Sequence, residues 1–385
     1  MKFKAFFPFS FMLVFFAASL STGSPVLWMI SLLLCFSLIA GICSVLWVSG
    51  TLRLQAELTE EKVHRGQEVS VRIRISHRGL IPVAPLRLEL NAVDGNTAET
   101  VYLRDAPGKN QFLVFPFSAA HVGIFRVGVS SCLTEDLLGF FQIRKNIAGA
   151  TEELLVLPGT FDTDPLPLSP GDPGSDSMSR AAEDLSAPSD IRSYQPGDPL
   201  KKIHWKLSLR KSELLVRTYD EPILRDVLIL MDCSRPPSWG HPEAGADVRD
   251  ALLETAASIF SNQAGTDLGL HLPLFGRHPA ELENGMGLPL ILEHLARADF
   301  SEPSPFESVL QLEARRMRNV GCLVVITARL NSNMVDVMIR MRRLGPCIRL
   351  YLITYAPEDS QVLPLIGRLQ QADIEVSYVR PERTV

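Results

Sequence analysis

Four polar side chains in the second half of the chain have the types and spacing that could do chemistry. Asp198 and His204 lie close together in a polar stretch, and Asp232 and Ser234 directly follow the apolar run 227–231. A neutral imidazole beside a carboxylate can serve as a general base or as a metal ligand. One function that this set allows is a metal-assisted hydrolase in which Asp198, His204 and Asp232 converge.

The polar stretch, residues 190–221, also carries a basic cluster. Its members are Arg192, Lys201, Lys202, Lys206, Arg210 and Lys211. In a hydrolase, Arg192 or Arg210 would stabilise a developing anion.

A structural role is the alternative for the same stretch. In that arrangement His204 donates to a backbone carbonyl, Trp205 packs in the core, and Arg210 pairs with Asp198 or Glu221. A histidine without a second His or Cys at ligand spacing makes a poor metal site. We therefore favour the structural role over the catalytic one.

Alternating strands and helices must position these residues. The continuous apolar run 227–231 is typical of a strand covered on both faces of a parallel sheet, so Asp232 should emerge at its carboxyl edge. A helix is expected next, with Val248, Leu252 and Ile259 on its apolar face. Further strands are expected over 268–275, 322–326, 348–353 and 374–379, and further helices over 288–298, 306–318, 334–344 and 362–372. This order predicts a doubly wound α/β domain, in which ligands bind at the carboxyl ends of the strands.

The chain before this domain reads as strands. Apolar and polar residues alternate over 69–75, and shorter alternating runs at 86–90 and 125–129 are separated by Gly, Pro and Asn clusters. We expect an antiparallel β-sandwich over residues 51–157, acting as a spacer or docking module. The Pro-, Gly- and Ser-rich residues 158–190 are expected to form a linker before the last domain.

The chain begins with two apolar segments. No Asp, Glu, Lys or Arg lies in residues 5–52, and the sequence is interrupted only by the turn-like residues 21–25. At about 1.5 Å per residue, the second segment, 26–48, is long enough to cross a hydrocarbon core of roughly 30 Å. The first, 6–20, is shorter and also resembles the apolar region of a signal peptide. We expect a two-helix transmembrane hairpin over residues 1–50.

Basic residues flank this hairpin. Lys2 and Lys4 precede it, Arg53, Lys62 and Arg65 follow it, and the connecting loop has none. The positive-inside rule then places both ends in the cytoplasm, giving a multi-pass protein of the inner (plasma) membrane with cytoplasmic soluble domains. The alternative is an envelope structural protein whose soluble part lies outside the cytoplasm.

Composition excludes several classes of function. With 38 basic and 43 acidic residues the net charge is -5, which gives no support for nucleic-acid binding. The six cysteines form no CxxC pair, so neither a disulfide framework nor a thiolate zinc site is expected. The sequence also lacks the GxxxxGK[ST] loop of P-loop ATPases.

The polar stretch resembles the signature of the bacterial "domain of unknown function 58" family, which also shows a following strand that ends in an Asp, here Asp232. The matching residues are Arg192, Tyr194, Pro196, Gly197, Asp198, Ile203, His204, Trp205, Ser208 and Arg210. Residues 121–123 and 136–141 are similar to the part of such proteins that precedes the linker. The resemblance implies a membrane-anchored protein with a von Willebrand factor A-like domain. It also implies a partner, either a MoxR-type AAA+ ATPase or a transglutaminase-like protein.

In von Willebrand A-like domains, an Asp-x-Ser-x-Ser loop, a distant Thr and a later Asp hold Mg²⁺. Here Asp232 and Ser234 keep the first two positions, but Pro236 stands at the third, and the later strand ends in Thr327-Ala328-Arg329, where the pattern would place an Asp. A hard divalent cation needs converging oxygen ligands. We therefore expect no cofactor, with Mg²⁺ at Asp232 and Ser234 as the alternative.

Taken together, these observations predict a membrane-anchored, non-enzymatic protein-interaction adaptor that acts through a degenerate von Willebrand A-like domain. The metal-assisted hydrolase is the alternative function.

Overall fold

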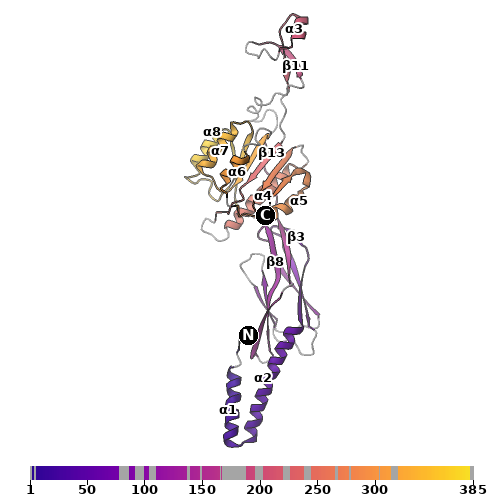
Figure 1. The fold of residues 1–385 in the computed structure, drawn as a ribbon, viewed down its shortest axis with the longest axis vertical. Helices are drawn as coiled ribbons and strands as arrows, with labels where there is room; N and C mark the ends of the chain where they lie inside the picture. Colours follow the sequence, from indigo (N-terminus) through magenta and orange to yellow (C-terminus); the bar gives the residue numbers. More distant parts are fainter. Residues whose placement is uncertain are drawn as a thin grey trace. The chain divides into compact units, whose positions relative to one another are not determined.

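The computed structural model describes most of the chain in two compact units, Met1–Leu157 and Pro158–Val385 (Figure 1). The described residues are 2–3, 6–77, 86–91, 99–103, 110–136, 139–147, 150–164, 166, 188–195, 203–219, 226–237, 244–264, 268–276, 279–302, 304–313 and 320–381.

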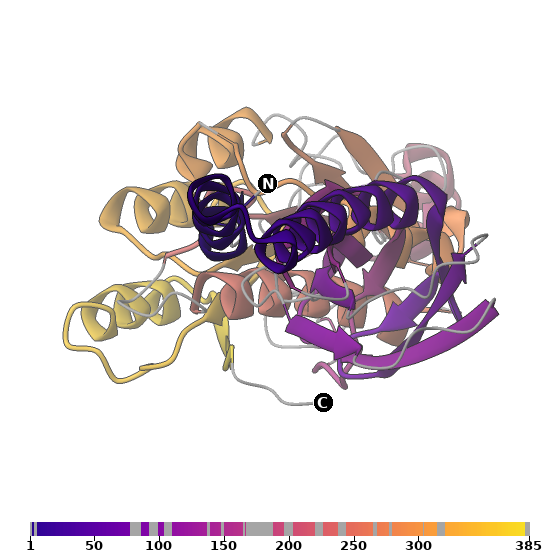
Figure 2. The same ribbon diagram turned by 90° about the horizontal axis from the view of Figure 1, so that it is seen from below.

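The first unit begins with two helices, α1 (Phe6–Thr22) and α2 (Pro25–Thr51), which lie side by side (Figures 1 and 2). The hydroxyl of Ser31 donates to the carbonyl of Met12 across their contact, at 3.3 Å. With 27 residues and a mean hydropathy of 2.5, α2 is the one helix among the described residues that is long and apolar enough to cross a bilayer. At 17 residues, α1 is shorter, as its sequence segment predicted.

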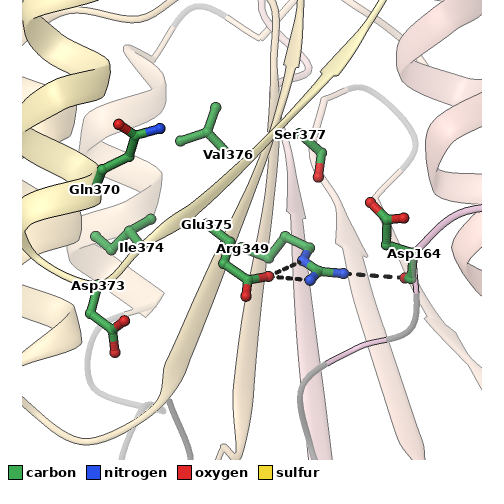
Figure 3. Close-up of a pocket in the computed structure, with 8 residues that line it drawn as sticks. All are labelled: Asp164, Arg349, Gln370, Asp373, Ile374, Glu375, Val376 and Ser377. Atoms are coloured by element: carbon green, nitrogen blue, oxygen red, sulfur yellow. Dashed lines mark hydrogen bonds and ion pairs between the residues drawn. The ribbon is translucent and has the colours of Figure 1, made fainter. Parts of the chain in front are cut away.

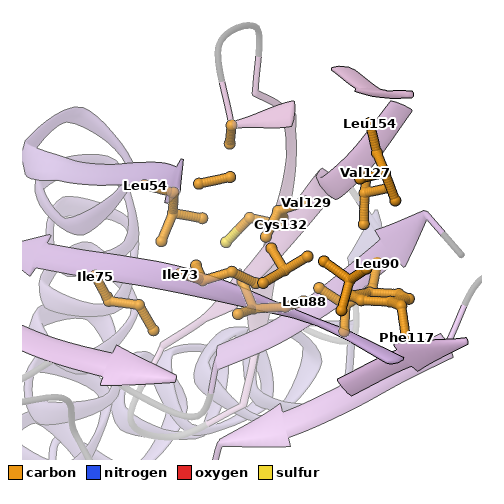
Figure 4. Close-up of a cluster of buried hydrophobic side chains, with 14 of the residues drawn as sticks. Leu54, Ile73, Ile75, Leu88, Leu90, Phe117, Val127, Val129, Cys132 and Leu154 are labelled. Carbon is orange, nitrogen blue, oxygen red and sulfur yellow. The ribbon is translucent and has the colours of Figure 1, made fainter. Parts of the chain in front are cut away.

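The first unit also contains two sheets, whose strands follow the helices in the chain except for the first, which precedes them. The strands are β1 (Lys2–Phe3), β2 (Leu52–Leu58), β3 (Lys62–His64), β4 (Glu68–His77), β5 (Leu86–Asn91), β6 (Glu99–Leu103), β7 (Asn110–Ser118), β8 (Gly123–Glu135), β9 (Phe141–Asn146) and β10 (Thr151–Leu157). A seven-stranded sheet runs β1-β9-β8-β10-β3, with β5 pairing with both β8 and β6, and a three-stranded sheet runs β2-β4-β7. Apolar side chains from both sheets form a single buried cluster (Figure 4).

One strand pair departs from the expected all-antiparallel arrangement. β3 and β10 are parallel, with Leu155 opposite Lys62 and Leu157 opposite His64. Parallel neighbours cannot be joined by a tight turn. In agreement with this, most of the sequence of the unit lies between β3 and β10. The alternation predicted over 69–75 is confirmed: Val71, Ile73 and Ile75 are fully buried in β4.

The carboxyl half of α2 packs against β9 and the loop before it, with a glycine at the contact. Leu38 and Val45 of α2 form a small apolar cluster with Phe141, at the start of β9. A Cβ at Gly41 would lie 3.1 Å from the Asp136 carboxylate and 3.3 Å from the Phe141 ring. The buried Asp136 carboxylate in turn accepts the Phe141 backbone N–H at 2.7 Å. The close approach of helix and loop therefore requires a residue without a side chain.

We predict that Gly41→Leu loosens this docking. The added side chain must displace Asp136 and Phe141, a cost of about 1–3 kcal/mol for an overpacked site. Gly50→Leu is the matched control, because a Cβ at Gly50 has nothing within 4 Å and both changes raise helix propensity equally. Thermal unfolding of the full chain in detergent micelles should show a midpoint several degrees lower for Gly41→Leu alone. Equal midpoints for the two variants would contradict the docking.

The second unit contains the predicted alternation of strands and helices. Its strands are β13 (Asp226–Met231), β14 (Gly269–Leu274), β15 (Ala280–Glu283), β16 (Cys322–Thr327), β17 (Cys347–Ile353) and β18 (Glu375–Val379). Its helices are α4 (Ala244–Asn262), the short 3-10 helix η3 (Asn284–Met286), α5 (Leu288–Ala296), α6 (Phe306–Glu313), α7 (Ser332–Arg342) and α8 (Leu363–Gln371). The sheet order is β15-β14-β13-β16-β17-β18, and all neighbours are parallel except β15, which is antiparallel to β14.

Helices cover both faces of this sheet. One face packs its leucines, among them Leu228, Leu323 and Leu350, against α6, α7 and α8. Helix α4 contacts β13, β16 and β17, and α5 contacts α4 and β15. Because successive side chains of a strand point to opposite faces, alternate residues of β13 and β16, among them Ile229 and Val324, are buried on the α4 side.

The first residues of the expected linker are part of this unit. The Phe161 backbone N–H donates to Ser258 of α4 at 2.9 Å, and the Asn262 side chain donates to the Phe161 carbonyl at 3.1 Å. The Arg349 guanidinium donates to the Asp164 carbonyl at 3.2 Å. These bonds hold residues 158–164 on the α/β sheet and α4, whereas residues 165 and 167–187 lie outside the described part of the chain.

Candidate functional site

The carboxyl ends of β13 and β16 bring two distant polar residues together. Parallel pairing sets Met231 opposite Ile326, so the next residue of each strand, Asp232 and Thr327, emerges at the same edge. β13 and β16 are neighbours in the middle of the sheet. From β13 the chain continues to β14 on one side, and from β16 it continues to β17 on the other side, so the strand order reverses between them. In open α/β sheets, such a switch point is where ligands bind.

The Asp232 carboxylate is buried, and side chains and backbone of this chain satisfy both of its oxygens. Oδ1 accepts the Ser234 hydroxyl at 2.6 Å and the Ser234 backbone N–H at 3.1 Å. Oδ2 accepts the Thr327 hydroxyl at 2.9 Å. The Arg329 backbone N–H donates to the Thr327 hydroxyl at 3.1 Å, which fixes its position. Asp232 thus organises both loops at this edge.

The loop offers a metal few oxygen donors. Of the predicted set, Asp232 and Ser234 contact each other, and Pro236 has no side-chain oxygen. Thr327, which the sequence analysis did not select, supplies one hydroxyl. The Arg329 guanidinium reaches back and donates to the Arg235 carbonyl, which places positive charge at the same edge. Mg²⁺ binding to Asp232 and Ser234 stays a prediction that this arrangement does not favour.

Cys233 lies between Asp232 and Ser234 in the chain, but its thiol is unreactive. Its thiol is buried, and this burial raises the pKa of Cys233 to about 12. A thiol with so high a pKa carries almost no thiolate at neutral pH and is a poor nucleophile. The edge therefore has no activated cysteine at this position.

We predict that Thr327→Val destabilises the unit by about 1–3 kcal/mol, because the buried Asp232 carboxylate then loses a donor. Thr327→Ser keeps the hydroxyl and should be close to wild type. The measurement is urea unfolding of the full chain in detergent, followed by tryptophan fluorescence or circular dichroism. If valine and serine give the same free energy of unfolding, the Thr327–Asp232 bond does not organise this edge.

The polar stretch forms a separate small module. Strand β11 (Pro188–Ser193) pairs antiparallel with β12 (Leu215–Tyr219), and the short helix α3 (Trp205–Lys211) lies between them in the chain (Figure 1). Ile203 forms an isolated bridge with Val216, which brings the start of α3 against β12.

His204 caps helix α3. Its ring Nδ1 accepts the Leu207 backbone N–H at 3.3 Å, and its own backbone N–H donates to the Leu215 carbonyl at 2.8 Å. The expected structural arrangement had His204 donating to a backbone carbonyl, whereas the ring nitrogen is an acceptor here, because the first turn of a helix has unpaired N–H groups. One ring nitrogen of the proposed base is therefore engaged.

Ser208 lies on the buried side of α3 and links the helix to β12. Its hydroxyl lies 3.1 Å from the His204 carbonyl and accepts the Leu215 backbone N–H at 2.9 Å. Ser212, with φ of 55°, ends the helix in the left-handed region. Through Ser208, the helix has a fixed orientation on β12.

Trp205 points to solvent, contrary to the core position that the structural alternative gave it. Its exposed fraction is 57%, and that of Leu209, one helical turn later, is 81%. Because Ser208 occupies the buried side, the helix has no room to bury these two side chains as well. Leu209 was missed by the sequence analysis, although its spacing of four residues from Trp205 places both on one face.

Residues 190–380 match the model of the family described as protein of unknown function DUF58. We call this range the DUF58 segment. It contains most of the β11–α3–β12 module and the α/β sheet, and it includes the signature residues from Arg192 to Arg210. The similar residues 121–123 and 136–141 lie outside the matched range.

YeaD of Bacillus subtilis (strain 168), named an uncharacterized protein, is 23% identical over 208 residues. The match covers 51% of this chain and 48% of YeaD, so the chain spans about half the length of that relative.

Solved structures give weaker likenesses. A CARDB domain from Pyrococcus furiosus is 16% identical with a TM-score of 0.21, covering 28% of this chain and 94% of that domain. A cohesin module from a Clostridium perfringens family 33 glycoside hydrolase is 12% identical with a TM-score of 0.21, covering 28% and 97%. TM-scores this low carry no argument about fold or function.

The other predicted residues of the DUF58 segment fall into two groups. Arg192 and Tyr194 lie on or beside β11, where the Tyr194 backbone N–H donates to the Leu214 carbonyl at 2.8 Å, and Arg210 is exposed on α3. Gly197 and Asp198 lie outside the described residues. The convergence of Asp198, His204 and Asp232 therefore stays a prediction.

A pocket of about 390 Å³ opens beside β18, and no predicted site residue is among the described residues that line it (Figure 3). Its most prominent group is Arg349, whose guanidinium is engaged by Glu375 and by the Asp164 carbonyl. With its charge paired in this way, Arg349 serves to join β17, β18 and residues 158–164.

Proposed function

We propose that this protein is a membrane-anchored, non-enzymatic interaction protein whose DUF58 segment binds another protein. The observation that carries the proposal is the outward face of α3. Trp205 and Leu209 are exposed together, while Ser208 and the cap at His204 hold the helix rigidly beneath them. A rigid helix that presents a tryptophan and a leucine is suited to insert them into a partner's apolar pocket.

The surroundings of this face define the chemistry of the partner. Lys206, Arg210 and Lys211 are exposed on the same short helix, next to Trp205 and Leu209. Complementary charge directs association and fixes the register of an interface. The partner surface should therefore be an apolar pocket rimmed by Asp or Glu side chains.

The resemblance supplies the class of partner. We take the α/β sheet as a degenerate von Willebrand A-like domain. We take a MoxR-type AAA+ ATPase as the partner of the protein, with a transglutaminase-like protein as the second choice. The paired Asp232 and the unreactive thiol of Cys233 support a binding role over a catalytic one.

For the anchor, we propose that both α1 and α2 cross the inner membrane and that both soluble units are cytoplasmic. The contact of α1 with α2 supports a paired insertion, and the basic residues Lys2, Lys4 and Arg53 support the orientation.

Cysteine labelling tests this topology. We predict that Thr22→Cys, at the exposed end of α1, reacts with an impermeant maleimide in intact cells, while Glu153→Cys reacts only after permeabilisation. The side chain of Glu153 is 65% exposed, whereas native Cys132 is buried with its pKa raised to about 12 by that burial and would not report. Labelling of Glu153→Cys in intact cells would reverse the orientation, and protection of Thr22→Cys would remove the first span.

Binding to a purified MoxR-type ATPase from the same cell tests the α3 face. We predict that Leu209→Asp and Trp205→Ala each weaken binding by about tenfold or more, because buried aromatic and apolar anchors dominate interface energies. Leu312→Asp is the matched control, since Leu312 is also exposed, at 68%, but lies on α6.

The measurement is biolayer interferometry with the full chain in detergent micelles. The proposal is wrong for this surface if Leu209→Asp and Leu312→Asp bind equally well. A photo-crosslinker at position 209 that captures only lipid would make α3 a membrane-surface helix instead.

A further inference from the structure

The antiparallel edge of the α/β sheet carries a second group of titratable side chains. His271 lies on β14, and Glu281 and Glu283 lie on β15. Their potential ligand atoms, one from each residue, all lie within 4.8 Å of one another. All three side chains are at least partly accessible to solvent, so an ion can reach them.

Strand register holds these three residues on one face. His271 is paired directly with Glu283, and its Nδ1 is 3.6 Å from the Glu283 carboxylate. Glu281 is two residues earlier on β15, and residues separated by two along a strand share a face. The buried Leu272 and Leu282 between them point to the opposite face and lock the pair together.

A third carboxylate, that of Asp226, lies on the neighbouring strand β13. Asp226, on β13, pairs with Gly269, and Leu228 pairs with His271, so Asp226 shares the face of the histidine. A Cβ at Gly269 would lie 2.5 Å from Asp226 Oδ1 and 3.6 Å from His271 Nε2. The Asp226 carboxylate and the Nε2 edge of the His271 ring therefore both border the space that the glycine leaves open.

We propose that His271, Glu281 and Glu283 bind a divalent first-row transition-metal ion, with Zn²⁺ as the preferred ion. His271 ligates through Nδ1, on the side of Glu283, and Asp226 accepts the Nε2–H and so fixes the tautomer. Metal-bound histidines commonly pass their other ring N–H to a carboxylate in this way. Two ligating carboxylates balance the charge of the ion.

The donor set selects the class of ion. Imidazole nitrogen with two carboxylates is a usual ligand set for Zn²⁺, whose fourth position is then open to water. Mg²⁺ prefers oxygen ligands alone in a strict octahedron, so an imidazole disfavours it. Tetrahedral ligand atoms lie about 3.3 Å apart at normal zinc distances, a closure that rotation of the exposed glutamates can supply.

Such an ion would brace the edge of the sheet. β15 is a four-residue strand with a single neighbour, β14, and a metal bridging both strands would hold it in place. This site lies on the face of the sheet at mid-strand, apart from the carboxyl edge at Asp232, so the two can be tested separately.

Isothermal titration calorimetry of the full chain in detergent micelles tests the site with Zn²⁺ alone. The expected result is one Zn²⁺ per chain, with at least tenfold weaker binding of Mg²⁺. His271→Gln and Glu283→Gln should each weaken Zn²⁺ binding by at least tenfold, and Asp226→Asn by about tenfold, the usual effect of losing a carboxylate behind a metal-bound histidine.

Matched controls separate this site from non-specific binding. His294→Gln and Glu293→Gln, on α5, should bind Zn²⁺ as the unmodified chain does, and so should Asp232→Asn. Glu281→Gln is a further variant in case one of the others fails to fold, and circular dichroism reports folding for each. Absence of Zn²⁺ binding up to about 100 μM, or binding unchanged in His271→Gln and Glu283→Gln, would overturn the proposal.

Discussion

The parallel pairing of β13 with β16 is the constraint on which the α/β unit depends. It aligns the buried carboxyl ends of the two strands and so brings Asp232 to Thr327, 95 residues later in the chain. A buried carboxylate must be hydrogen-bonded, and three donors from Ser234 and Thr327 meet that need. The same bonds that stabilise the edge use the oxygens that a metal would require.

The sheet edge at Asp232 and the helix α3 expose opposite kinds of side chain. At the sheet edge, the hydroxyls of Ser234 and Thr327 point inward and donate hydrogen bonds to the Asp232 carboxylate. On α3, the single buried polar residue, Ser208, anchors the helix, and the large apolar side chains turn outward. Covering exposed apolar surface is favourable in water, and this is the reason that we propose binding as the role of this module.

The metal site that we propose lies on β14 and β15 and not at the carboxyl edge of the sheet. Asp232 is closed in by its own loop, whereas His271, Glu281 and Glu283 remain accessible on a face fixed by strand register. Sequence patterns do not indicate this group, because Glu281 and Glu283 resemble any exposed pair on a short strand. Only the pairing of β14 with β15 shows that His271 lies opposite Glu283.

Local patterns in the sequence determined the elements: the apolar length of α2, the alternation in β4, and the order of strands and helices from β13 to β18 could all be read directly, because each depends on a short repeating period. Tertiary structure alone decided which residues meet. The bond between Thr327 and Asp232, the exposure of Trp205, the parallel pairing of β3 with β10 and the fit of Gly41 against Phe141 all arise from contacts between segments far apart in the chain or from competition for one buried side. Periodicity carries no information about such contacts, since it records which face of an element is apolar and not what covers that face.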